Sequence, residues 1–116
     1  GAEQVLVRLH AIGINPVETY IRSGRYARLE PLPYTPGTDG AGVVVKAGHG
    51  VTGLREGDRV YLSGSVTGAY AELALCERAQ VHPLPEGAGF KDGAALGIPY
   101  ATAHRALFHR GGAKAG

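Results

Sequence analysis

Residues 15–24 read NPVETYIRSG and carry the signals of a short helix at both ends. Asn15 has the side-chain oxygen with which an N-cap residue accepts a backbone N–H, and Pro16 suits the first helical position, where an N–H has no partner in the helix. Glu18 can reach back to the cap N–H in a capping box, and Gly24 can take the left-handed conformation that ends a helix. We therefore predict a short, capped helix here.

The segments around this helix have the pattern of short strands. Apolar and polar side chains alternate over residues 5–11, which is typical of a half-buried strand. Three further strands are predicted at residues 41–47, 59–62 and 68–76. The 19 glycines and 7 prolines favour many turns between them. Short strands with frequent turns indicate a mainly β domain, either a small barrel or a sandwich.

From about Phe90 the pattern becomes helical, and Gly111 would end the helix. Four residues can form an apolar stripe along it: Leu96, Tyr100, Ala103 and Leu107. Helical structure is therefore predicted only near residue 20 and after residue 90.

Residues 48–53 fit the G-x-G-x-x-G motif of dinucleotide-binding sites. That motif requires a following helix whose N-terminus faces the pyrophosphate. Residues 54–58 are too short, and too soon interrupted by Gly57, to supply such a helix. We predict a turn between two strands instead of a phosphate site.

The composition excludes several classes of protein. The chain has 116 residues, enough for one domain, and its net charge of +2 is too small to indicate nucleic-acid binding. It contains no run of about 18 apolar residues, so no membrane-spanning segment is predicted. The single cysteine, Cys76, cannot form an internal disulfide, which suits a reducing compartment such as the cytoplasm. Gly1 leads directly into a strand pattern, so we expect residues to precede it in the native protein.

Five motifs, in order and with consistent spacing, resemble the zeta-crystallin type of quinone oxidoreductase, a family of the medium-chain dehydrogenase/reductase superfamily. They are NPVETYIRSG at 15–24, PYTPGTDGAGVV at 33–44, GDRV at 57–60, GAYAE at 68–72 and GIPYATAHRAL at 97–107. The resemblance implies a mainly β fold, the GroES-like, partly open antiparallel β-barrel with a few short helices. It also implies that residues 1–116 form an incomplete catalytic domain, because a Rossmann domain follows in the family and is absent from this chain.

The resemblance locates the positions at which zinc-dependent members of the superfamily bind their catalytic metal. The position of the zinc-binding cysteine holds Asn15, and the Gly-His-Glu motif appears as GTD at residues 37–39. Neither asparagine nor threonine is a competent zinc ligand. Of the five histidines, only His104 and His109 are close in sequence, and a separation of five residues places them on different faces of an α-helix. We therefore predict no metal site.

Without a metal, a carbonyl must be polarised by hydrogen-bond donors, and Tyr20 and Tyr26 are the candidates. A tyrosine hydroxyl stays protonated at neutral pH and can donate to an oxygen on which charge develops. The resemblance implies that both side chains line a substrate cleft, so we predict them as catalytic residues. The alternatives are structural. Tyr20 shares a helix face with Val17 and Ile21 that we expect to be buried, and Tyr26 could be a loop residue packed on the barrel.

Asn15 and Thr102 are the predicted cofactor-binding residues. The resemblance implies that Asn15 lies near the nicotinamide or its ribose and that Thr102 lies near the nicotinamide carboxamide. The alternative for Asn15 is helix capping, which is compatible with a second contact. The alternative for Thr102 is a hydroxyl that bonds a carbonyl one helical turn back.

The intact protein is expected to be an NADPH-dependent quinone reductase. The resemblance implies NADPH as the cofactor, bound mainly by the absent Rossmann domain, quinones as substrates, and a homo-oligomer at full length. The chain alone would then be inactive. Two alternatives stay open: a zinc-free enone or enoyl reductase of the same superfamily, and a non-catalytic role as a crystallin or RNA-binding protein. The RNA role rests on family analogy alone, because the sequence shows neither a basic stripe nor an aromatic platform.

Overall fold

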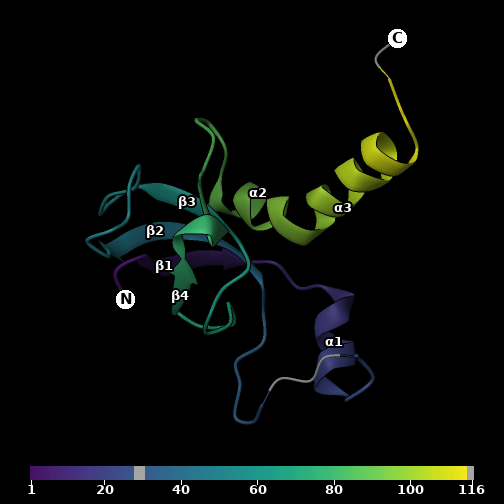
Figure 1. The fold of residues 1–116 in the computed structure, drawn as a ribbon, viewed down its shortest axis with the longest axis horizontal. Helices are drawn as coiled ribbons and strands as arrows, with labels where there is room; N and C mark the ends of the chain where they lie inside the picture. Colours follow the sequence, from purple (N-terminus) through teal and green to yellow (C-terminus); the bar gives the residue numbers. More distant parts are fainter. Residues whose placement is uncertain (28–30, 115–116) are drawn as a thin grey trace.

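A curled, five-stranded antiparallel sheet forms the body of the domain in the computed structural model, which describes residues 1–27 and 31–114 (Figure 1). The order across the sheet is β4-β1-β2-β3-β5. The strands are β1 (Gln4–Ile12), β2 (Asp39–Ala47), β3 (Arg59–Ser63), β4 (Leu73–Glu77) and β5 (Val81–Pro83). The two edge strands, β4 and β5, follow one another in sequence through a single 3₁₀ turn, η1 (Arg78–Gln80). This sheet confirms the predicted mainly β, partly open antiparallel barrel.

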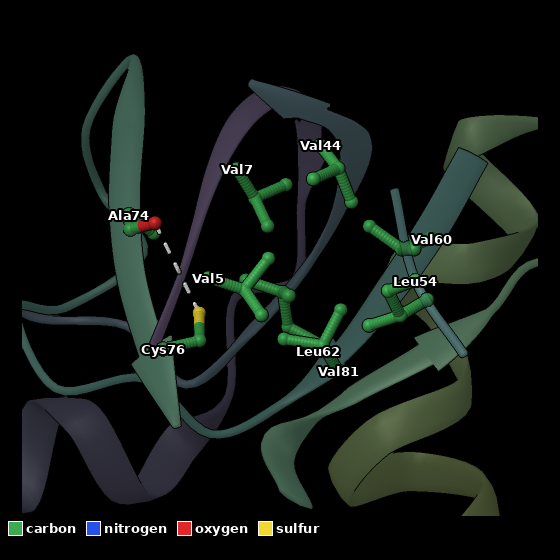
Figure 2. Close-up of a cluster of buried hydrophobic side chains, with 9 residues drawn as sticks. All are labelled: Val5, Val7, Val44, Leu54, Val60, Leu62, Ala74, Cys76 and Val81. Atoms are coloured by element: carbon green, nitrogen blue, oxygen red, sulfur yellow. Dashed lines mark hydrogen bonds between the residues drawn. The ribbon is translucent and has the colours of Figure 1, made fainter. Parts of the chain in front are cut away.

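The core lies on the concave side of the sheet, where alternate residues of each strand meet (Figure 2). Val5 and Val7 of β1 are fully buried while Arg8 is exposed, as the alternating pattern predicts. Burying one valine or leucine side chain contributes about 1.5–3 kcal/mol, so this cluster stabilises the fold substantially. Its members are Val5, Val7, Val44, Leu54, Val60, Leu62, Ala74, Cys76 and Val81.

The fourth predicted strand starts later than expected, at Leu73 in place of residue 68. Gly68 has a φ of +87°, and the amides of Ala69 and Tyr70 donate to the carbonyls of Gly37 and Pro36, both at 2.9 Å. Residues 68–70 therefore bond to the loop before β2 and cannot extend β4. The three-residue strand β5 was not predicted, because it is too short to show alternation. Residues 48–53 form a turn between β2 and β3, as predicted.

The predicted first helix is α1 (Pro16–Arg22), and Gly24 follows it with a φ of +73°. Its buried face differs from the prediction. Glu18 is the buried residue of the helix, whereas Val17 and Ile21 are half-buried and Tyr20 is exposed. The helix is therefore attached to the domain through a carboxylate and not through an apolar stripe.

The predicted C-terminal helix is a broken run of α2 (Phe90–Ala94), α3 (Ala101–His104) and two π-helical segments, η2 (Leu96–Tyr100) and η3 (Arg105–Arg110). Helix α2 packs on β1, β2 and β3, and the run bends at Gly97, whose ψ is −106°. Beyond this bend α3 extends away from the sheet (Figure 1). Three members of the predicted stripe, Tyr100, Ala103 and Leu107, are consequently exposed.

Candidate functional site

Three polar side chains are buried together where α1 and β2 begin: Asn15, Glu18 and Asp39. The pairing of β1 with β2 explains why they meet. Ile12 is paired with Gly40, and the amide of Gly13 donates to the carbonyl of Asp39 at 3.0 Å. The chain leaving β1 must therefore pass over Asp39 as it enters α1.

Asp39 accepts two hydrogen bonds on one carboxylate oxygen. Asn15 Nδ2 and the backbone amide of Ile98 each donate to Oδ2 at 2.9 Å, whereas the buried Oδ1 has no partner among the described residues. Burial raises the pKa of Asp39, because desolvation disfavours the carboxylate more than these two bonds favour it, and the nearby Glu18 charge adds to the rise. The Asn15 side chain is thus a donor to Asp39, and the predicted capping bond from its oxygen is not formed.

Glu18 joins three segments through both of its carboxylate oxygens. Oε2 accepts from the amide of Asn15 at 2.9 Å, as the capping box predicts, and from the Tyr70 hydroxyl at 2.5 Å. Oε1 accepts from the amide and the hydroxyl of Thr38 at 3.2 and 3.4 Å. Burial, followed by the bond to Glu18, raises the pKa of Tyr70 to about 12, so its hydroxyl remains a donor across the physiological range. Glu18 therefore ties α1 to the loops that precede β2 and β4.

A cavity of about 710 Å³ opens beside Glu18. Its walls are Glu18 and Ile21 of α1, residues 31 and 33–38, and residues 65–68. The hydroxyl of Tyr34, one of the lining residues, is buried and has no partner in the described part of the chain. None of the four predicted site residues is among the residues that line this cavity.

The structure places the predicted site residues in different surroundings. Asn15 is in the buried cluster, whereas Tyr20 and Tyr26, in and after α1, are about half exposed, at 52% and 46% of the residue surface. Thr102 is exposed on α3, which lies apart from α1 in Figure 1. Within residues 1–27 and 31–114, no hydrogen bond joins any two of these four side chains. Their catalytic and cofactor-binding roles remain predictions.

Asn15 and Thr38 stand at the positions that the family resemblance assigns to zinc ligands, and their side chains do not suit a zinc ion. Catalytic zinc sites use thiolate, imidazole and carboxylate ligands, whereas here Asn15 donates its amide N–H to Asp39 and Thr38 donates its hydroxyl to Glu18. Among the described residues, no group of three or more histidine, cysteine, aspartate or glutamate side chains is gathered as a metal site.

The prediction for the two C-terminal histidines was wrong. The rings of His104 and His109 lie 5.5 Å apart, centroid to centroid, on the same face. His104 ends α3 and His109 lies in the π-helical segment η3, whose i→i+5 hydrogen bonds widen the turn and bring residues five apart closer in direction than in an α-helix.

Sequence reasoning missed the side-chain partners of Asp39 and Tyr70. Tyr70 is 52 residues from Glu18, and Asp39 is 24 residues from Asn15, so no local pattern connects them. The one available signal was polar: Asp39 stands at the start of an otherwise apolar strand pattern, where an isolated carboxylate is unusual.

Comparison with known proteins places this geometry in a family. Residues 1–86 match the model of the alcohol dehydrogenase GroES-like domain. The chain is 56% identical over 115 residues to a quinone oxidoreductase of Rattus norvegicus, covering 99% of this chain and 35% of the relative. It is 55% identical over 113 residues to that of Homo sapiens, covering 97% and 34%. The chain thus spans about a third of the length of these relatives.

A solved structure gives the same result. The Escherichia coli quinone oxidoreductase complexed with NADPH superposes with a TM-score of 0.86 at 35% identity, covering 95% of this chain and 33% of that one. In the part of the chain that the structure describes, every helix is too short or too polar to cross a bilayer. From the family match over 86 residues, this chain is a member of the alcohol dehydrogenase GroES-like domain family.

Proposed function

We propose that the intact protein is an NADPH-dependent quinone reductase and that this chain supplies the GroES-like part of its catalytic domain. The observation that carries the proposal is the 56% identity to a quinone oxidoreductase over 99% of the chain. The matched segment includes both the buried Asn15–Glu18–Asp39 cluster and the helix that carries Thr102. The similarity to an enzyme solved with NADPH supports the choice of cofactor.

NADPH would supply the hydride, and the side chains of this domain would orient the reactants. Tyr20 and Tyr26 suit the role of donors to a quinone oxygen, because both are half-exposed and within the described residues neither hydroxyl is held by another side chain. Asn15 would contact the cofactor through its side-chain oxygen, which accepts no side-chain cap bond and is not used in the contact with Asp39. The zinc-free character of the reaction is part of the proposal, since the donor set around Asn15 does not suit zinc.

Turnover by the full-length protein tests the proposal. NADPH oxidation is followed at 340 nm (about the absorption maximum of the reduced nicotinamide) with 9,10-phenanthrenequinone and, separately, with a conjugated enone. We expect turnover with the quinone, a much lower kcat/KM with the enone, and no loss of activity after dialysis against a chelator. A preference for the enone would favour the enone or enoyl reductase alternative.

The non-catalytic alternative predicts a different outcome. A crystallin or RNA-binding protein would show no quinone-dependent NADPH oxidation, and RNA binding would weaken steeply with salt. The cytoplasmic location and the homo-oligomeric state complete the proposal. Size-exclusion chromatography of the full-length protein tests the oligomer.

A further inference from the structure

The carboxylate of Asp39 connects two segments that are far apart in the sequence. Its Oδ2 accepts from Asn15 Nδ2 at the start of α1 and from the amide of Ile98 in η2, each at 2.9 Å. The backbone of Asp39 is fixed by the sheet, where the residue pairs with Ser63 of β3. Through these two hydrogen bonds, the side chain of Asp39 joins the sheet to the N-cap of α1 and to the bend that leads into α3.

Two glycines let these segments approach Asp39 closely. A Cβ on Gly97 would lie 2.1 Å from Asp39 Oδ1, and a Cβ on Gly13 would lie 2.9 Å from Asp39 Cβ. Neither overlap could be relieved easily, because Asp39 is buried with 1% of its surface exposed. Gly97 also has the non-helical ψ at which the helical run bends. The backbone around Asp39 is therefore shaped to receive its carboxylate.

We propose that Asp39 is a positioning residue, which sets the placement of Asn15 relative to the helix that carries Thr102. This inference rests on the proposed function, in which both side chains hold the nicotinamide of NADPH. Asp39 itself has no contact with the cofactor in this scheme. Its effect on binding is indirect, through the two donors that it fixes.

The chemistry of the contact predicts a graded series of variants. In Asp39→Asn, the amide oxygen can occupy the place of Oδ2 and keep both accepted bonds. In Asp39→Ala, both donors lose their acceptor, so the side-chain hydrogen bonds that join Asn15 and η2 to Asp39 are lost. Asp58→Ala is the matched control, because Asp58 also accepts a backbone amide, that of Arg55 at 2.9 Å, in a surface turn.

The test measures the Kd of NADPH for the full-length protein by fluorescence titration, together with KM for the quinone at saturating NADPH. For Asp39→Ala we expect the Kd of NADPH to rise about tenfold or more, because two buried donors lose their acceptor. Asp39→Asn should stay within about threefold of the wild type, and Asp58→Ala should not change. An unchanged Kd in a folded Asp39→Ala variant, or an equal rise in Asp58→Ala, would overturn the proposal.

Gly97→Ala provides a second route if Asp39→Ala does not fold. The added methyl group should displace the helix from Asp39 and raise the Kd of NADPH. Wild-type affinity in Gly97→Ala would contradict the proposal. Amide hydrogen exchange at residues 96–100 should accelerate in Asp39→Ala. This result does not depend on which reaction the full-length enzyme catalyses. If the wild type itself fails to bind NADPH, the proposed function fails, whereas unchanged exchange in the variant refutes the Asp39 contact alone.

Discussion

Glu18 illustrates what a local pattern can and cannot predict about a site. Its bond to the amide of Asn15 spans three residues and follows from the capping-box pattern. Its bond to Tyr70 spans 52 residues and depends on how the loops before β2 and β4 pack. A buried carboxylate is costly unless its oxygens are paired, and the four donors around Glu18 meet this need.

Glu18→Gln should destabilise the protein, because the glutamine amide nitrogen would replace one acceptor oxygen. Either the amide of Asn15 or that of Thr38 then loses its partner. We expect the free energy of unfolding to fall by about 1–3 kcal/mol, measured by urea denaturation. The exposed Glu56→Gln is the control and should have no effect. Equal stability of the two variants would show that Glu18 does not hold these segments.

Tyr20→Phe and Tyr26→Phe test the proposed hydrogen-bond donors in the full-length enzyme. Loss of one donor to a developing oxyanion costs up to about 10²–10³ in kcat, so we expect the double variant to lose at least about tenfold in kcat with quinone. Tyr61→Phe is the control, because the Tyr61 ring stacks on His82 in the sheet at 5.0 Å. Full activity of the double variant would exclude both tyrosines from catalysis.

The raised pKa of Asp39 gives stability a pH dependence of defined sign. The folded protein binds this proton more tightly than the unfolded chain, so Asp39 stabilises the fold most below its ordinary pKa of 3.8 and loses this contribution as pH rises through the folded-state value. The stability of the wild type relative to Asp39→Asn should therefore decrease as pH rises from about 3.5 toward neutrality. Urea denaturation at several pH values measures this difference, and a pH-independent difference would contradict it.

The helices and strands were predictable where the signal lies within a few residues. Alternation located β1, and the Pro16 and Gly24 signals set the bounds of α1. The errors lie where contacts with residues far away in the sequence determine the local structure. Residues 68–72 have the composition of a strand, yet Gly68 turns the chain onto the loop at residues 35–37. The π-helical hydrogen bonding of η3, which no local pattern marks, brought the rings of His104 and His109 close together.

Gly68→Ala should therefore disturb the packing of the loop before β4. An added Cβ would lie 2.0 Å from the Thr35 carbonyl oxygen, and the φ of Gly68 is +87°. Gly87→Ala is the matched control, with a similar φ of +82° and no atom within 4 Å of the added Cβ. We expect Gly68→Ala to lower the free energy of unfolding by about 2 kcal/mol more than the control. Equal losses in urea denaturation would mean that backbone strain alone matters.

The molecule as a whole is a curled sheet. Its two edge strands, β4 and β5, follow one another in sequence. Arg78, in the turn that joins these edges, donates to the carbonyls of Thr52 and Val81 at 2.9 and 2.8 Å. Strand content followed from the sequence pattern, but the order β4-β1-β2-β3-β5 did not, because β1 pairs with a strand more than 60 residues later. The strand and turn pattern left a barrel and a sandwich as alternatives, and the family resemblance chose the barrel.

The fully buried Cys76 can report the opening of this curled sheet through the rate at which its thiol is labelled. Burial, with the charge of Glu77, raises the pKa of its thiol to about 12, so the native protein presents almost no reactive thiolate. Iodoacetamide should label Cys76 only when β4 separates from β1, and the labelling rate in dilute urea should follow the population of unfolded molecules. Fast labelling without denaturant would mean that β4 detaches while the rest of the sheet stays folded.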